Sequence, residues 1–174
     1  MDVIEFAMKM EQDGKAYYEK LAAQTTVPEL KQVLLTLAEE EGRHYEYFRR
    51  LKEDNNNIPG DKAFTGRQSV EKIVNIFEQL AEDENSKRFE EEVISAWTKA
   101  LRIEEKSVDF YESKAATETD SARKGLLQKI AEEEHNHVHM IDGVLMYLKH
   151  PAAFAESSHF KSFRSLEGWG YDDV

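Results

Sequence analysis

Cysteine is absent from the 174 residues of this sequence. A chain without cysteine cannot form a disulfide framework, a Cys-ligated zinc site or an iron–sulfur cluster, and it has no thiol nucleophile. Glycine and proline are scarce, with eight and three residues, and no apolar run is long enough to span a membrane. Long stretches of Glu, Lys, Ala and Leu instead predict a helical protein.

Basic residues are also outnumbered by acidic ones. The chain has 23 Lys and Arg residues and 35 Asp and Glu residues, which gives a formal net charge of −12. This balance argues against nucleic acid and anionic membranes as partners. The first residues carry acids at positions 2 and 5 and lack the basic and apolar regions of a signal peptide, so we expect a cytoplasmic protein. The length fits one domain with a sizeable core.

Apolar residues recur at steps of three and four in four stretches, which predicts amphipathic helices over about 2–25, 28–53, 88–117 and 120–149. Pro28 suits the first turn of the second helix, and Asp120 or Ser121 suits the N-cap of the fourth. The Asn-rich segment 54–60 breaks the pattern. Residues 61–87 predict a short amphipathic helix inside a long connection, with an apolar face of Val70, Ile73, Val74, Phe77 and Leu80.

Short turns within each pair of helices predict two antiparallel hairpins, joined by roughly thirty residues. Helices of ~25 residues are about 37 Å long, and a connection of this length can run from one end of a bundle to the other. We therefore expect residues 1–149 to form an all-α four-helix bundle with one long crossover between the second and third helices, the ferritin-like topology. Residues 150–174 predict an irregular C-terminal tail, packed on the bundle or on a second subunit, that contains Phe154, Phe160, Phe163, Trp169 and Tyr171.

One set of side chains occurs twice along the chain. A glutamate is followed thirty residues later by Glu-x-x-His, and every member of the second set lies 93 positions after its counterpart. The two sets are Glu11, Glu41 and His44, and Glu104, Glu134 and His137. Four carboxylates and two imidazoles are a ligand set for a pair of transition-metal ions, most often iron, with manganese or a mixed pair as alternatives.

The six residues lie on the apolar stripes of their helices, so packing the stripes carries them inside. Four buried carboxylates would cost many kcal/mol or would have to stay protonated. Two divalent cations balance this charge. A lone Glu-x-x-His in a Glu-rich helix usually belongs to a surface salt-bridge face, but the recurrence of the whole set argues against that interpretation here.

A second choice of ligands is possible in each Glu-x-x-His pair, because Glu40 directly precedes Glu41 and Glu133 directly precedes Glu134. We favour Glu41 and Glu134, which continue the apolar stripes. Glu40 and Glu133 then lie about 100° round their helices. There they could accept hydrogen bonds from the histidines across the bundle, Glu40 from His137 and Glu133 from His44.

Tyr18 and Tyr111 follow the first glutamate of each set by seven residues. Two helical turns place both near the site, where each hydroxyl could bond a ligand or bound peroxide and so act in catalysis; ordinary core packing is the alternative. Gly14 and its counterpart Ser107 are small and leave room beside the metals. His135 and His139 point away from the core and are expected on the surface.

These residues resemble the ferritin-like di-iron superfamily, and most of all its rubrerythrin-type members. The resemblance covers residues 1–149, places the six residues on the family's ligand positions, and includes the stretches 11–18 and 103–111 and the tail segment 155–160. It implies two iron ions per chain, used to reduce peroxide or to oxidise ferrous iron with oxygen or peroxide.

Two departures from that family pattern matter. Rubrerythrins usually carry an extra carboxylate where this chain has Ser107, so this site is more symmetric and closer to that of bacterioferritin. They also usually carry a Cys-ligated rubredoxin module, which a chain without cysteine cannot form. The electron donor would therefore be a separate, rubredoxin-like protein.

Three functions follow as hypotheses. The first is a di-iron oxidoreductase that reduces hydrogen peroxide and acts as a homodimer, with Glu41 and Glu134 bridging the two ferrous ions. The second is a ferroxidase or iron-handling protein with dioxygen or peroxide as oxidant, which would assemble into a closed shell. The third is a metal-free helical interaction module.

Overall fold

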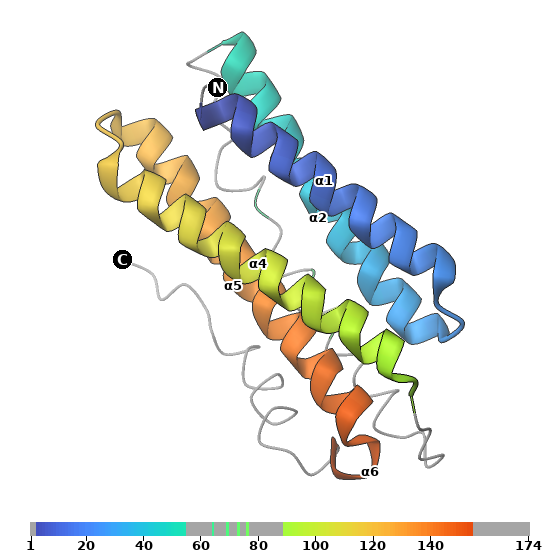
Figure 1. The fold of residues 1–174 in the computed structure, drawn as a ribbon. Helices are drawn as coiled ribbons and strands as arrows, with labels where there is room; N and C mark the ends of the chain where they lie inside the picture. Colours follow the sequence, from blue (N-terminus) through green and yellow to red (C-terminus); the bar gives the residue numbers. More distant parts are fainter. Residues whose placement is uncertain are drawn as a thin grey trace.

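The computed structural model describes residues 3–54, 64, 69, 73, 76 and 89–154. The helices whose bounds are described are four long ones and one short one: α1 (Val3–Gln24), α2 (Pro28–Glu53), α4 (Glu91–Thr117), α5 (Ser121–Lys149) and α6 (Pro151–Phe154). The predicted all-α four-helix bundle is confirmed (Figure 1). The described part of the chain contains no helix with the length and apolar character needed to cross a membrane.

The four long helices pair as two hairpins, α1 with α2 and α4 with α5. Figure 1 shows that α2 ends and α4 begins at opposite ends of the bundle. The end of α2 and the start of α4 are therefore placed as the predicted crossover requires.

Local chemistry explains where the helices begin. Pro28 is the first residue of α2, where its missing N–H needs no intrahelical acceptor. Asp120, rather than Ser121, caps α5, because its carboxylate accepts from the backbone N–H groups of Ala122 and Arg123.

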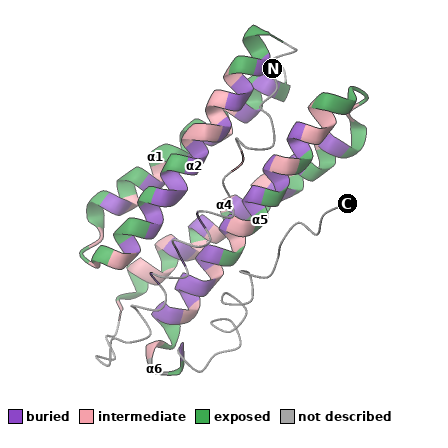
Figure 2. Cartoon of the chain, turned by 180° about the vertical axis from the view of Figure 1, so that it is seen from behind, coloured by how far each residue is buried: buried purple, intermediate pink, exposed green. Residues whose placement is uncertain are grey.

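Two apolar clusters fill the bundle. One contains Tyr18, Leu34, Trp97 and Ile141, and the other contains Ile4, Phe48, Tyr111 and Ile130. Buried residues form a stripe along each long helix, with exposed residues on its outer side (Figure 2). The predicted ligands belong to neither cluster; they form a polar layer on the same stripes.

Four residues of the long connection are described, and three of them, Ser69, Ile73 and Ile76, are helical and buried. Ile73 belongs to the predicted apolar face, whereas Val70, Val74, Phe77 and Leu80 lie outside the described residues. Thr36, Glu40 and Tyr47 lie on the face of α2 beside the ligand stripe, and all three residues are buried.

Residues of the connection cover part of this face of α2. The ring of Phe64 lies 5.2 Å from that of Tyr47, and the Ser69 hydroxyl donates to Glu40.

The tail begins differently from the prediction. Residues 151–154 form the short helix α6 instead of irregular chain, because Pro151 is well suited to a first helical position. Phe154 is fully buried, with its ring 5.5 Å from that of Tyr147 on α5. The other tail aromatics, Phe160, Phe163, Trp169 and Tyr171, lie outside the described residues.

Candidate metal centre

All four long helices contribute to the polar layer. Glu11 comes from α1, Glu104 from α4, and a Glu-x-x-His pair from each of α2 and α5. None of the six predicted ligands is more than 4% exposed. The structure thus brings together the whole set that the sequence analysis selected.

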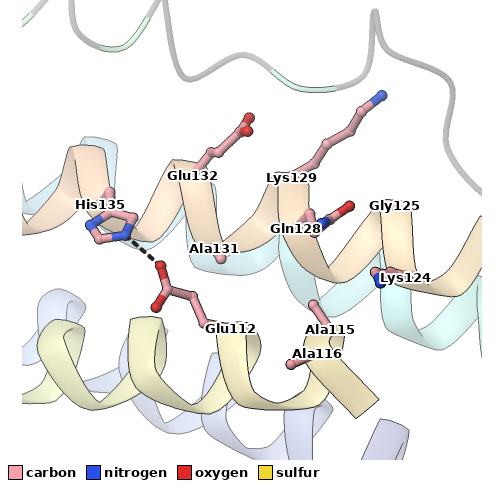
Figure 3. A pocket seen from close by; sticks show the side chains of 10 residues that line it. All are labelled: Glu112, Ala115, Ala116, Lys124, Gly125, Gln128, Lys129, Ala131, Glu132 and His135. Atoms are coloured by element: carbon pink, nitrogen blue, oxygen red, sulfur yellow. Dashed lines mark hydrogen bonds and ion pairs between the residues drawn. The ribbon is translucent and has the colours of Figure 1, made fainter. Parts of the chain in front are cut away.

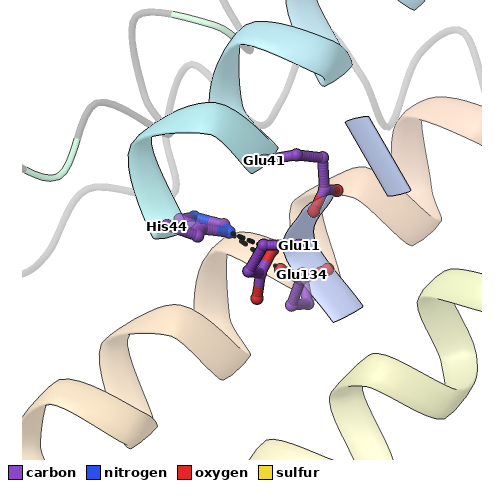
Figure 4. Close-up of side chains that lie close together, drawn as sticks. All are labelled: Glu11, Glu41, His44 and Glu134. Atoms are coloured by element: carbon purple, nitrogen blue, oxygen red, sulfur yellow. Dashed lines mark ion pairs between the residues drawn. The ribbon is translucent and has the colours of Figure 1, made fainter. Parts of the chain in front are cut away.

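The six side chains form two overlapping groups. Glu11 and His44 lie with Glu41 and Glu134 in one group, and Glu104 and His137 lie with the same two glutamates in the other. Within each group the potential ligand atoms are all within 4.8 Å of one another. Figure 4 shows the first group, with the side chains converging from different helices. Two sites that share two carboxylates are the arrangement expected for a bridged metal pair.

The histidines are held in matching orientations. The Nε2 atom of His44 lies 2.9 Å from Glu133, and that of His137 lies 2.6 Å from Glu40, as predicted. An ionised carboxylate can only accept, so Nε2 carries the proton in each ring. The Nδ1 atoms therefore face the centre, where each can bind a metal ion that displaces its proton, and the rings stack with centroids 5.8 Å apart.

The tyrosines fix the other two glutamates. The Tyr111 hydroxyl donates to Glu11 Oε1, and the Tyr18 hydroxyl donates to Glu104 Oε1. Each tyrosine therefore contacts the glutamate of the opposite hairpin. This leaves the Oε2 atoms of Glu11 and Glu104 near the histidines, 3.5 Å from His44 Nδ1 and 3.4 Å from His137 Nδ1 respectively.

The donor atoms fit a metal pair. Among the described residues, the buried side-chain atoms without a hydrogen-bond partner are the Nδ1 atoms of His44 and His137, Glu104 Oε2 and both carboxylate oxygens of Glu134. Every one belongs to a predicted ligand. Unsatisfied buried polar atoms are costly, and cations bound between them would remove that cost.

Burial and repulsion between the carboxylates shift the pKa values of the glutamates in the metal-free site. Burial and the nearby Glu134 carboxylate raise the pKa values of Glu41 and Glu104 well above the usual range. Burial also opposes ionisation of Glu134, but the positive charge of the nearby His137 dominates and holds the pKa of Glu134 well below the usual value.

The pKa values of the two histidines also depend on a balance between burial and neighbouring charges. Burial would lower the pKa values of His44 and His137, but the carboxylates around them raise both well above the usual value. The metal-free site therefore retains protons at neutral pH, and metal ions have to displace them.

Gly14 lies against one of the shared carboxylates. A Cβ atom added there would lie 3.1 Å from Glu41 Oε2 and 3.2 Å from its Cδ. Replacement by alanine should stabilise the metal-free helix by up to ~1 kcal/mol. It should also displace the Glu41 carboxylate and weaken metal binding about 10-fold, the lower end for changes just outside a ligand set.

Gly125→Ala is the matched control for Gly14→Ala, because a Cβ atom at Gly125 on α5 meets nothing within 4 Å. The two variants would be compared by chemical denaturation and by Mn(II) titration. If Gly14→Ala bound metal as tightly as Gly125→Ala, the close approach of Glu41 would have no role in binding.

The structure adds two residues that the sequence analysis did not select. Arg43 Nη2 lies 2.9 Å from Glu40 Oε1, and the Ser69 hydroxyl donates to the same oxygen. The spacing of three residues on one helix could have suggested the contact of Arg43. No local pattern could have suggested Ser69, because its position depends on the path of the connection.

A surface groove lies between α4 and α5, away from the six ligands. Ala115, Gly125 and Lys129 are among the residues that line it, and His135 Nε2 lies 3.0 Å from Glu112 Oε1 in its wall (Figure 3). None of the six predicted ligands lines this groove. His135 and His139 are exposed, as expected.

Comparison with known proteins identifies the family of the chain. The family model described as rubrerythrin matches residues 2–145, which is most of the chain and includes every predicted ligand. Searches of curated proteins and of solved structures gave no match. With a helical bundle, two buried Glu/His clusters and this match in agreement, the chain belongs to the rubrerythrin family of ferritin-like di-iron carboxylate proteins.

Proposed function

We propose that this protein is a di-iron oxidoreductase that reduces hydrogen peroxide. The observation that carries the proposal is the sharing of Glu41 and Glu134 by two buried ligand groups. Two ferrous ions held there would supply one electron each, which matches the two electrons and two protons that convert one hydrogen peroxide into two water molecules.

The surrounding side chains support this role by fixing the ligands. Tyr111 is fully buried, and burial together with the Glu11 charge raises the pKa of its hydroxyl well above the usual value. The hydroxyl therefore keeps its proton and holds Glu11 by a hydrogen bond. Tyr18 holds Glu104 in the same way. We assign both tyrosines to the reaction centre as groups that orient the terminal carboxylates.

The proposal includes a separate electron donor and a second copy of the chain. No cysteine of this chain can hold a rubredoxin-type iron, so the electrons would come from a separate donor protein. We propose that the protein acts as a cytoplasmic homodimer.

Anaerobic stopped-flow mixing of the diferrous protein with hydrogen peroxide tests the reaction. We expect oxidation of the iron to be faster than that of free ferrous ion and faster with peroxide than with dioxygen. Glu134→Gln is the control for iron that binds elsewhere. Oxidation no faster than that of free ferrous ion would reject the proposal.

A ferroxidase function is the alternative, favoured by one observation. Ser107 is half-buried and occupies the position of the extra carboxylate found in most rubrerythrins. Without that carboxylate, the two halves of the ligand set are alike. A ferroxidase of the ferritin kind would assemble into a large shell and take up far more than two irons per chain. Size-exclusion chromatography and iron-loading stoichiometry distinguish the two functions.

A further inference from the structure

The carboxylate of Glu40 receives three hydrogen bonds from three different parts of the chain. One oxygen, Oε1, accepts from Arg43 Nη2 at 2.9 Å and from the Ser69 hydroxyl. The other oxygen, Oε2, lies 2.6 Å from His137 Nε2. Because two donors hold Oε1, the carboxylate cannot rotate freely, and Oε2 is presented to the histidine ring.

The orientation of Glu40 decides the orientation of His137. Its Nε2–H is bonded to Oε2, so the opposite ring atom, Nδ1, faces the group formed by Glu41, Glu104 and Glu134. A carboxylate that holds the remote nitrogen of a ligating histidine fixes both the tautomer and the ring angle. Ser69 therefore acts on the centre through two successive hydrogen bonds.

The equivalent carboxylate in the other half has a different environment. The side chain of Glu133 is 10% exposed, whereas that of Glu40 is 2% exposed. The repeat places the uncharged Asn136 where Arg43 stands in the first half. Hydrogen bonds and electrostatic interactions become stronger as water is excluded. The hydrogen bond between Glu40 and His137 should therefore be stronger than the one between Glu133 and His44.

We propose that Ser69 is a positioning residue of the metal centre, which makes the metal position at His137 bind more tightly than the one at His44. Through Ser69, the connection between α2 and α4 then contributes a residue to the support of the site. Ser69 is 3% exposed, and its hydroxyl donates to Glu40 in a site largely shielded from solvent. The proposal rests on the metal centre and does not depend on whether the substrate is peroxide or dioxygen.

The first test uses the metal-free protein labelled with ¹⁵N-histidine. Ser69→Ala should shift the ring nitrogen signals of His137 while those of His44 stay in place. Glu40→Ala, which removes the acceptor itself, should produce at least as large a change. Thr36→Val is the matched control, because the Thr36 hydroxyl is also buried on this side of α2 but bonds the backbone carbonyl of Gln32.

The second test is an anaerobic titration with Co(II), followed by its absorption and by the signals of the two histidines. Wild-type protein should fill the His137 position before the His44 position. Ser69→Ala should weaken the first step about 10-fold and leave the second nearly unchanged, and Thr36→Val should change neither.

Several outcomes would overturn the proposal. Unchanged His137 signals in Ser69→Ala or Glu40→Ala would show that the hydrogen bonds do not orient the ring. Equal weakening of both binding steps, together with a lower Tm, would show that Ser69 only packs the core. If wild-type protein bound no Co(II), the metal centre itself would be rejected, and the ring signals would still decide whether Ser69 orients His137.

Discussion

Replacing Glu134 by glutamine should abolish binding of the metal pair. Glu134 is the only residue of α5 shared by both ligand groups, and neither of its buried oxygens has a hydrogen-bond partner among the described residues. Glutamine keeps the shape but removes the charge and one acceptor oxygen. We expect affinity to fall by more than about 100-fold, the upper end for changes outside a ligand set. Anaerobic titration with Mn(II) and metal analysis after dialysis measure the effect.

Glu132→Gln is the matched control for this substitution. Glu132 lies on the same helix two residues away and is exposed, so the variant loses the same charge without entering the site. It should bind two metals as the wild type does. If Glu134→Gln also bound two metals with wild-type affinity, the shared carboxylate would not be a bridge. If neither the wild type nor the variants bound metal, the metal-free interaction module would become the better hypothesis.

Metal binding should raise the Tm of the wild-type protein by roughly 15–30 °C. A ligand that binds only the folded state at about 1,000 times its Kd adds ~4 kcal/mol per site. Chains of this length gain about 2–4 °C in Tm for each kcal/mol. The expected effect is large because the metals also relieve the repulsion that raises the pKa values of Glu41 and Glu104.

Differential scanning calorimetry with Mn(II), which avoids oxidation during heating, measures this shift. Excess chelator should reverse it, and Glu134→Gln should show little of it. A shift below about 2 °C at saturating Mn(II) would contradict the coupling between metal binding and folding.

Much of this protein could be predicted from local sequence patterns. Helical periodicity located the four long helices to within about three residues, and the chemistry of Pro28 and Asp120 located two of their starts. The repeat at a constant offset selected the six candidate ligands. The 100° step around a helix also predicted the hydrogen bonds from His44 to Glu133 and from His137 to Glu40.

The partners of the tyrosines required the tertiary structure. Along the sequence, Tyr18 follows Glu11 by two helical turns, but its hydroxyl bonds Glu104, and Tyr111 bonds Glu11. The reason is that α1 and α4 run in opposite directions. Moving along α1 from Glu11 to Tyr18 corresponds to moving back along α4 from Tyr111 to Glu104, so each tyrosine lies opposite the other helix's glutamate.

The repeated set of two glutamates and a histidine therefore determined which side chains could bind metals, because position on the apolar stripe and spacing along a helix are local properties. Only the tertiary structure decided which tyrosine bonds which glutamate, with the tyrosines exchanged between hairpins, and that Ser69 holds Glu40. These contacts join residues far apart in the chain. Their geometry depends on how the hairpins and the connection pack, which no short-range pattern specifies.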